Sequence, residues 1–105
     1  MSIVVILEEP PPRFVYIDAL LVWPNARSPF QKGSCHMFAA SEHLDLLHDV
    51  ARRLGLRREW FQRSAACDHY DLAPSRRWAA LLLPEVREVS RPEAVAIWRR
   101  NRRGK

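Results

Sequence analysis

The sequence predicts one small domain of the α/β class, with a small, partly parallel sheet and three helices. With 105 residues, 48% of them hydrophobic, the chain is long and apolar enough for a single packed core. Strand-like segments dominate its first half, and helical and strand-like patterns alternate in its second half, which favours this class. We therefore expect a single domain over residues 13–98, with an arm or strand before it at 1–12 and a basic tail after it at 99–105.

Three apolar segments predict the strands of the first half. Residues 3–7 are mostly β-branched and lie before a run of prolines, so they predict a strand or a loosely attached arm. Residues 14–20 are apolar almost throughout, as in a strand that is covered on both faces. Residues 35–39 predict another short strand. The segment 23–34 contains prolines and a glycine, and its length is typical of a binding or covering loop.

The most strongly patterned element is a helix over residues 41–54. Ser41 is a favourable N-cap, and Gly55 stands where a left-handed residue commonly ends a helix. The predicted apolar stripe of this helix consists of Leu44, Leu47, Val50, Ala51 and Leu54. His48 falls at the edge of the stripe, between the core and the solvent.

A second helix and a short strand follow. Pro74 suits the first turn of a helix over residues 74–83, and Pro84 stops it. We expect Trp78 on the apolar face of this helix, and therefore in the core. Residues 86–89 predict the strand.

The last helix leads into a basic segment. Ser90 and Glu93 have the spacing of a capping box, and Trp98 is expected in the core. Twelve Lys and Arg balance twelve Asp and Glu up to Trp98, so the net charge of +5 comes from residues 99–105. Such a tail could contact the phosphates of a nucleic acid, or it could simply be solvated.

The two cysteines, Cys35 and Cys67, are expected to be free thiols in a cytoplasmic protein. The apolar segment 3–7 is too short for a signal peptide and lacks basic flanks, and no apolar run approaches the length of a membrane span. Disulfides are rare in reducing compartments. We therefore predict no contact with a membrane.

The densest group of chemically active residues is Trp60-Phe61-Gln62 followed by His69-Tyr70-Asp71. In an extended segment residues i and i+2 point the same way, so His69 and Asp71 face one ligand while Tyr70 packs behind them. Asp71 or Asp18 could orient a histidine that acts as a general acid or base. The catalytic candidates are His36, His48, His69 and Asp71. Alternatively, Asp71 caps the following helix with His69 as its hydrogen-bond partner, and His48 only packs at the helix boundary.

Ligand binding involves a second set of residues. Arg76 and Arg77 lie near the positive end of the second helix, where an anion could bind, unless they pair with Asp68 or Asp71. Aromatic residues of the site segment could stack a nucleobase or belong to the core. The ligand-binding candidates are Asp18, Trp60, Gln62, Tyr70, Arg76 and Arg77. Histidine and aspartate would suit a transition metal, but no HExxH, paired CxxC or EF-hand spacing occurs, so no metal site is predicted.

One series of aromatic, histidine and acidic positions spans most of the domain. Its members are Tyr16-Ile17-Asp18, Trp23, His36, Leu47-His48, Gly55-Leu56, Trp60-Phe61-Gln62 and His69-Tyr70-Asp71. With these residues the chain resembles the small bacterial and phage domains of the domain-of-unknown-function family DUF4031, over residues 16–90. The Trp-Phe-Gln and His-Tyr-Asp pair is the specific part of the resemblance.

The resemblance implies polar positions but no activity. These positions are Asp18, His36, His48, His69 and Asp71. The sequence departs from the family pattern in three places: residues 1–13 look like an added arm, Ala73 stands where Ser or Thr is frequent, and Leu83-Pro84-Glu85 replaces a turn of the Gly-Ala kind. The departure at Ala73 puts a capping or ligand-binding hydroxyl in doubt.

Two functions from different classes remain open on the sequence. In the first, the His/Tyr/Asp site binds, and could process, a phosphorylated or nucleotide-like ligand such as a phosphorylated metabolite, a nucleotide or a nucleic-acid end. In the second, the chain is a non-enzymatic accessory module that contacts protein or nucleic acid through its loop, arm or tail, for example as a homodimer. The sequence identifies no cofactor and leaves open whether the protein is an enzyme. In the first case His36, His48, His69 and Asp71 should converge; in the second they should be scattered.

Overall fold

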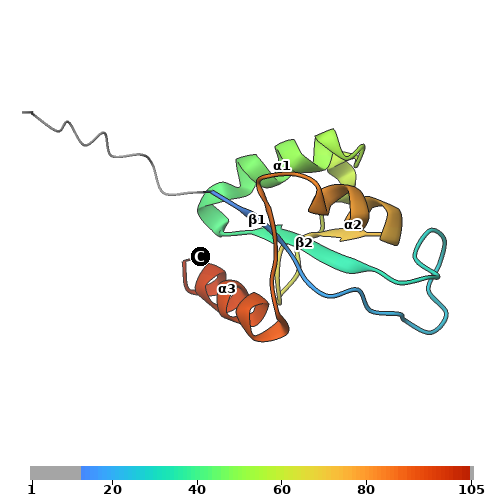
Figure 1. Ribbon diagram of the computed structural model, residues 1–105. Helices are drawn as coiled ribbons and strands as arrows, with labels where there is room; N and C mark the ends of the chain where they lie inside the picture. The colour runs from blue at the N-terminus through green and yellow to red at the C-terminus, as the bar shows by residue number, and fades with distance from the viewer. Residues whose placement is uncertain (1–12, 105) are drawn as a thin grey trace, which may run out of the picture.

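The structure, a computed structural model, describes residues 13–104 and places a four-stranded sheet between helices (Figure 1). The strands are β1 (Val15–Ile17), β2 (Cys35–Ala39), β3 (Tyr70–Leu72) and β4 (Val86–Glu88), and the α-helices are α1 (Leu44–Arg53), α2 (Pro74–Leu81) and α3 (Arg91–Arg103). Short 3₁₀ turns occupy Ser41–His43 and Arg58–Trp60. The strand order is β3-β2-β1-β4, and only the β1–β4 pair is parallel. The predicted α/β class is confirmed. The predicted arm at 1–12 lies outside the described residues.

The two faces of the sheet are covered by different helices. Figure 1 shows α1 and α2 on one side of the sheet and α3 on the other. Because side chains alternate along a strand, Cys35 and Met37 pack into the core beneath α1 and α2, whereas Phe38 packs against Trp98 of α3. The sheet therefore separates two hydrophobic clusters, and successive residues of one strand pack alternately into one cluster or the other.

The first strand is shorter than predicted. β1 ends at Ile17, whereas the sequence predicted a covered strand over residues 14–20. Ala19 and Leu20 are exposed, and the chain continues into the long loop, which is closed at its base by a bridge between Leu21 and Ser34. The apolar residues after Ile17 misled the prediction because they belong to this loop and not to the sheet.

The first helix begins later than predicted and ends at Arg53, one residue before the predicted end. Ser41 starts a 3₁₀ turn, and the Ser41 backbone N–H donates to Oδ1 of Asn101 in α3 at 2.9 Å, with no cap from the Ser41 side chain. The predicted N-cap at Ser41 is therefore wrong. At the other end Gly55 has φ 79°, and the Leu56 N–H donates to the carbonyl of Ala51 at 2.9 Å. This is the hydrogen bond expected of a left-handed helix end.

The predicted stripe of α1 is buried at its centre. Leu47, Val50 and Ala51 are buried, while the end residues Leu44 and Leu54 are only partly buried and pack against the core. The hydrophobic pattern therefore located the correct face of the helix.

The second helix ends at Leu81, two residues before the predicted end, and one of its predicted core residues is exposed. Trp78 is 71% exposed, whereas Ala80 is fully buried. Because an α-helix turns by about 100° per residue, Trp78 lies roughly 160° around the helix from Ala80. The face of α2 that meets the sheet carries a small residue, so the expectation of Trp78 in the core is wrong.

The predicted basic tail is largely helical. α3 opens with the capping box formed by Ser90 and Glu93, as predicted, and it continues through Arg103. Trp98 is buried, as predicted. Arginine is a good helix former and cations are favourable at a helix C-terminus, so the helix outlasts its apolar pattern. Arg100 pairs with Glu42 at 2.7 Å, which ties this end of α3 to the turn before α1.

Candidate functional site

Three of the four catalytic candidates converge on the α3 face of the sheet. His36 of β2 lies directly opposite Asp71 of β3 in the antiparallel register. His69 precedes Asp71 by two residues and is fixed by a backbone bridge to Gln62, with N···O distances of 2.8 and 2.9 Å. One side-chain ligand atom of each of His36, His69 and Asp71 lies within 4.8 Å of the other two. We call these three residues the His/Asp cluster.

Asp18 positions the first histidine of the cluster. Its two carboxylate oxygens accept hydrogen bonds from the backbone N–H and the ring Nδ1–H of His36, each at 2.7 Å. Asp18 is 6% exposed, so this is a nearly buried carboxylate with two donors. The acceptor places a proton on Nδ1, so in the neutral imidazole Nε2 of His36 carries the lone pair.

The second histidine forms an ion pair with the carboxylate of the cluster. His69 Nδ1–H donates to the Cys67 carbonyl at 2.8 Å, and Nε2 lies 3.3 Å from Oδ1 of Asp71. Burial lowers the pKa of His69, but the hydrogen bonds to Asp71 and Cys67 outweigh it and raise that pKa to about 10. The hydrogen bond with His69 in turn lowers the pKa of Asp71. His69 and Asp71 are therefore both charged at neutral pH.

Asp71 does not cap the following helix. The N-cap position of α2 is Ala73, with no side-chain cap, and Oδ2 of Asp71 instead accepts a hydrogen bond from Nε2 of Gln62 at 2.6 Å. The alternative interpretation of Asp71 as a helix cap is wrong. Ala73 lacks the hydroxyl that would have served as a cap, and both oxygens of Asp71 are directed towards the cluster and Gln62.

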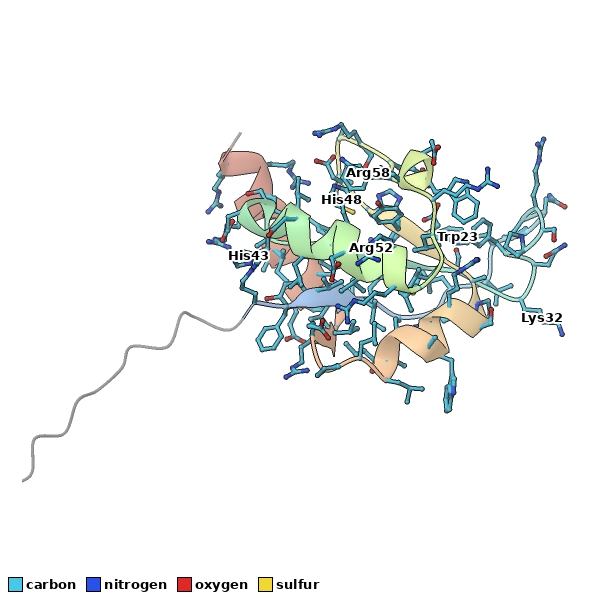
Figure 2. The ribbon with its side chains drawn as sticks, turned by 90° about the horizontal axis from the view of Figure 1, so that it is seen from above. Trp23, Lys32, His43, His48, Arg52 and Arg58 are labelled. Carbon is cyan, nitrogen blue, oxygen red and sulfur yellow. The ribbon has the colours of Figure 1, made fainter. Side chains whose placement is uncertain are left out.

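The fourth catalytic candidate lies on the opposite face of the sheet. His48 of α1 shares a hydrogen bond with the Tyr70 hydroxyl at 2.8 Å, and its ring packs edge-on against Phe61 at 4.7 Å between centroids. Burial, with the positive charges of Arg58 and Arg63, lowers the pKa of His48. Figure 2 shows His48 and Arg58 from the α1 side. His48 therefore packs at the helix boundary, as in the alternative interpretation, and does not join the His/Asp cluster.

Tyr70 explains this division. It stands between His69 and Asp71 in the chain, so its side chain points to the other face, as predicted. It is 1% exposed and belongs to the core beneath α1. Its hydroxyl reaches a hollow beside His48 and Arg58 on the α1 face, away from the His/Asp cluster, and the predicted ligand contact of Tyr70 stays a prediction.

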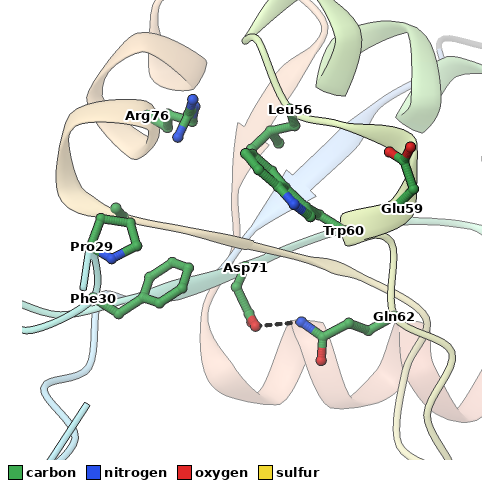
Figure 3. A pocket seen from close by; sticks show the side chains of 9 residues that line it. Pro29, Phe30, Leu56, Glu59, Trp60, Gln62, Asp71 and Arg76 are labelled. Atoms are coloured by element: carbon green, nitrogen blue, oxygen red, sulfur yellow. Dashed lines mark hydrogen bonds between the residues drawn. The ribbon is translucent and has the colours of Figure 1, made fainter. Parts of the chain in front are cut away.

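A pocket adjoins the cluster. It has a volume of about 440 Å³ and is lined by Pro29, Phe30, Leu56, Glu59, Trp60, Gln62, Asp71, Ala73 and Arg76. In Figure 3 the hydrogen-bonded Asp71 and Gln62 form one edge of this pocket, and Phe30 and Trp60 lie on opposite sides of it. Asp71 is thus shared by the pocket and the His/Asp cluster.

The two predicted anion-binding arginines have different surroundings. Arg76 lines the pocket; its guanidinium lies over the Trp60 ring, 5.6 Å from the centroid, and its Nε donates to the Leu54 carbonyl at 3.1 Å. Arg77 turns away from the pocket and donates to the backbone carbonyl of Asp18 at 3.1 Å and to Glu88. Of the two arginines, Arg76 is the one that lines the pocket beside the His/Asp cluster.

Sequence reasoning missed the contribution of the long loop to this pocket. Phe30 and Pro29 come from the loop, and Glu59 and Leu56 from the segment after α1. The length of the loop was the one indication of a binding role, and it did not identify which residues face the site. Elsewhere on the surface, Val22 and Trp23 of the loop and Trp78 and Leu82 near α2 are exposed apolar residues outside the pocket.

The chain matches a known protein family over most of its length. The family model described as "Protein of unknown function (DUF4031)" matches residues 15–101. The chain belongs to this family. No curated protein and no solved structure matches it. Within residues 13–104, none of the helices is long and apolar enough to cross a membrane. The family description names no activity.

Proposed function

We propose that this DUF4031 domain binds a small phosphorylated, nucleotide-like ligand in the pocket beside the His/Asp cluster. One observation carries the proposal: Asp71 belongs both to the wall of the pocket and to the cluster. A volume of about 440 Å³ falls within the range of small-molecule sites, roughly 300–1,000 Å³. A ligand in the pocket would therefore lie against a carboxylate that is itself paired with a histidine.

The lining of the pocket suits each part of such a ligand. Phe30 and Trp60 offer aromatic surface for a planar base. The Arg76 guanidinium can donate two parallel hydrogen bonds to a phosphate. Glu59 and Asp71 can accept hydrogen bonds from ligand hydroxyl or amino groups. Any reaction of the ligand would fall to His36, His69 and Asp71, the catalytic candidates that lie together.

The test is a calorimetric titration of the chelator-treated protein with adenosine 5′-monophosphate, with adenosine and with inorganic phosphate, each in a separate experiment. We expect the monophosphate to bind more tightly than adenosine. Arg76→Gln should weaken the binding of the monophosphate by about tenfold or more, because a hydrogen bond to a charged group contributes about 1.5–3 kcal/mol. The same change should leave adenosine binding nearly unaltered, and Trp60→Leu should weaken both.

Arg52→Gln is the matched control. Arg52 is an exposed arginine on α1 that pairs with Asp49 and does not line the pocket (Figure 2). Equal binding of adenosine and its monophosphate, or equal losses in the Arg76 and Arg52 variants, would contradict the proposal. So would a failure of all three compounds to bind at millimolar concentration.

A further inference from the structure

We propose that His36, His69 and Asp71 together bind a divalent transition-metal ion such as Zn²⁺. Their three ligand atoms lie within 4.8 Å of one another. Two imidazole nitrogens and one carboxylate oxygen are a frequent ligand set for Zn²⁺ and related ions. In a tetrahedral site with bonds of about 2.1 Å, ligand atoms are roughly 3.4 Å apart. Side-chain movements on the order of 1 Å would therefore complete the coordination.

Backbone pairing holds the three ligands in place. The β2–β3 register sets His36 opposite Asp71, and the bridge to Gln62 fixes the backbone of His69. Ligands carried on paired strands keep their spacing better than ligands on a loop. The site therefore needs no rearrangement of the chain before the ion binds.

Asp18 binds one ring nitrogen of His36 and leaves the other available to the ion. Asp18 accepts the Nδ1–H of His36 at 2.7 Å and is itself held by the His36 backbone N–H at 2.7 Å. A carboxylate on the far nitrogen of a metal-binding histidine fixes the tautomer and the ring orientation. Nε2 of His36 is thereby left as an acceptor for the ion.

The other two ligands have outer partners of the same kind. His69 Nδ1 donates to the Cys67 carbonyl at 2.8 Å, and Oδ2 of Asp71 accepts from Gln62 at 2.6 Å. This leaves Nε2 of His69 and Oδ1 of Asp71, 3.3 Å apart, for the ion. The ion would take the place of the proton between these two atoms. All three ligands are thus held through the atoms that the ion does not use, and this arrangement supports a metal site.

The ligand set also indicates which ions fit. Cys35 points into the core on the opposite face, and Sγ of Cys67 lies 3.6 Å from Nδ1 of His69, the nitrogen that the ion does not use. A site of nitrogen and oxygen ligands without thiolate suits Zn²⁺, Fe²⁺, Co²⁺ or Mn²⁺. Three protein ligands leave a position for water or a ligand atom. Because Asp71 also borders the pocket, a phosphate there could reach the ion; this last step alone rests on the proposed function.

The experiment uses the full chain, stripped of metal by a chelator and dialysed, with no nucleotide present. We expect one Co²⁺ per chain to give visible absorption bands without the thiolate charge-transfer band, and Zn²⁺ to displace it. His36→Ala and Asp71→Ala should each weaken the binding of Zn²⁺ by about a hundredfold. Gln62→Ala should weaken it by about tenfold, as expected when a residue that hydrogen-bonds to a metal ligand is removed. His43→Ala is the matched control and should bind as the wild type, because His43 lies in the turn before α1, outside the cluster.

Imidazole ¹⁵N spectra of the wild type test the site without relying on variants that must fold. Zn²⁺ should shift the signals of His36 and His69 and leave those of His43 and His48 in place. The absence of stoichiometric binding would overturn the proposal. So would a thiolate charge-transfer band, shifts at His43 or His48 alone, or equal losses in the His43 and Asp71 variants. Because nucleotide titrations are done with chelator and metal titrations without nucleotide, either proposal can fail separately.

Discussion

On the α1 side of the sheet His48 meets a hydroxyl and an aromatic ring, whereas on the α3 side His69 meets a carboxylate. His48 shares a hydrogen bond with Tyr70, and His69 pairs with Asp71. Tyr70 and Asp71 are consecutive residues of β3. Burial lowers the pKa of His48, and hydrogen bonds raise the pKa of His69 to about 10. Burial and nearby positive charges disfavour the proton on His48, whereas a carboxylate and a carbonyl that accept hydrogen bonds favour it on His69, so the surroundings of each histidine set its pKa.

The alternation of one strand separates these two environments. Tyr70 directs its side chain to the apolar face and supports α1, while Asp71 faces the polar cluster and the pocket. Two consecutive residues of one strand thus face a hydrophobic core on one side of the sheet and a cluster of titratable side chains on the other. The predictions below test this separation, beginning with the largest expected effect.

Each face of the sheet also has one buried cysteine, and the first prediction concerns the thiol on the apolar face. Burial raises the pKa of Cys35 to about 12. In a Cys67→Ser variant, where Cys35 is the remaining thiol, a disulfide reagent should therefore react at neutral pH at least about a thousandfold more slowly than with a free thiol. Stopped-flow absorbance measures the rate, and unfolding in denaturant should restore it. A rate within tenfold of glutathione would show that Cys35 is not protected by the core.

Removal of the Tyr70 side chain should have the largest effect on stability. Tyr70→Ala should lower the free energy of unfolding by about 3–5 kcal/mol, since it removes a fully buried aromatic ring from the core. Tyr70→Phe should cost only about 1 kcal/mol, the contribution of its hydrogen bond to His48. Denaturant unfolding measures both. Equal losses would mean that the hydroxyl, and not the packed ring, supports α1.

Asp71→Asn should affect stability less and function more. Asparagine keeps the shape of the side chain and replaces a charge-assisted hydrogen bond by a neutral one, so we expect a loss of about 1 kcal/mol. The variant should also lose the binding of metal and weaken that of the nucleotide ligand. Unfolding and calorimetry are measured on the same preparation. A loss as large as that of Tyr70→Ala, with ligand binding intact, would show that Asp71 is a structural residue.

The smallest expected effect is a pH dependence from His48. Because its pKa is lower in the folded than in the unfolded protein, the unfolded chain binds the proton more readily. The titration of His48 therefore has little effect on stability above pH 6.5. As the pH falls below this value, preferential protonation of the unfolded chain lowers the free energy of unfolding. His48→Asn should remove this part of the change in unfolding midpoint between pH 7.5 and 5. An unchanged pH profile would mean that His48 is as solvated in the fold as in the unfolded chain.

Local rules of the sequence determined several of these features. The i and i+2 relation placed His69 and Asp71 on one face and Tyr70 on the other, and Gly55 and the Ser90–Glu93 box located two helix ends. Each of these relations spans only a few residues, so backbone geometry fixes it before the chain is folded. The two sheet faces were thus implied by the sequence, although their covering helices were not.

Tertiary structure alone decided which residues meet across the chain. His36 reaches His69 and Asp71 only through the β2–β3 register, which is why no sequence spacing indicated a metal site. Asp18 was one of two possible partners for a histidine, and the end of β1 decided that it holds His36. Tyr70 packs in the core beneath α1, and its hydrogen bond to His48 keeps that histidine on the opposite face of the sheet. Such pairings depend on register and packing over long separations in sequence, which local propensity does not encode.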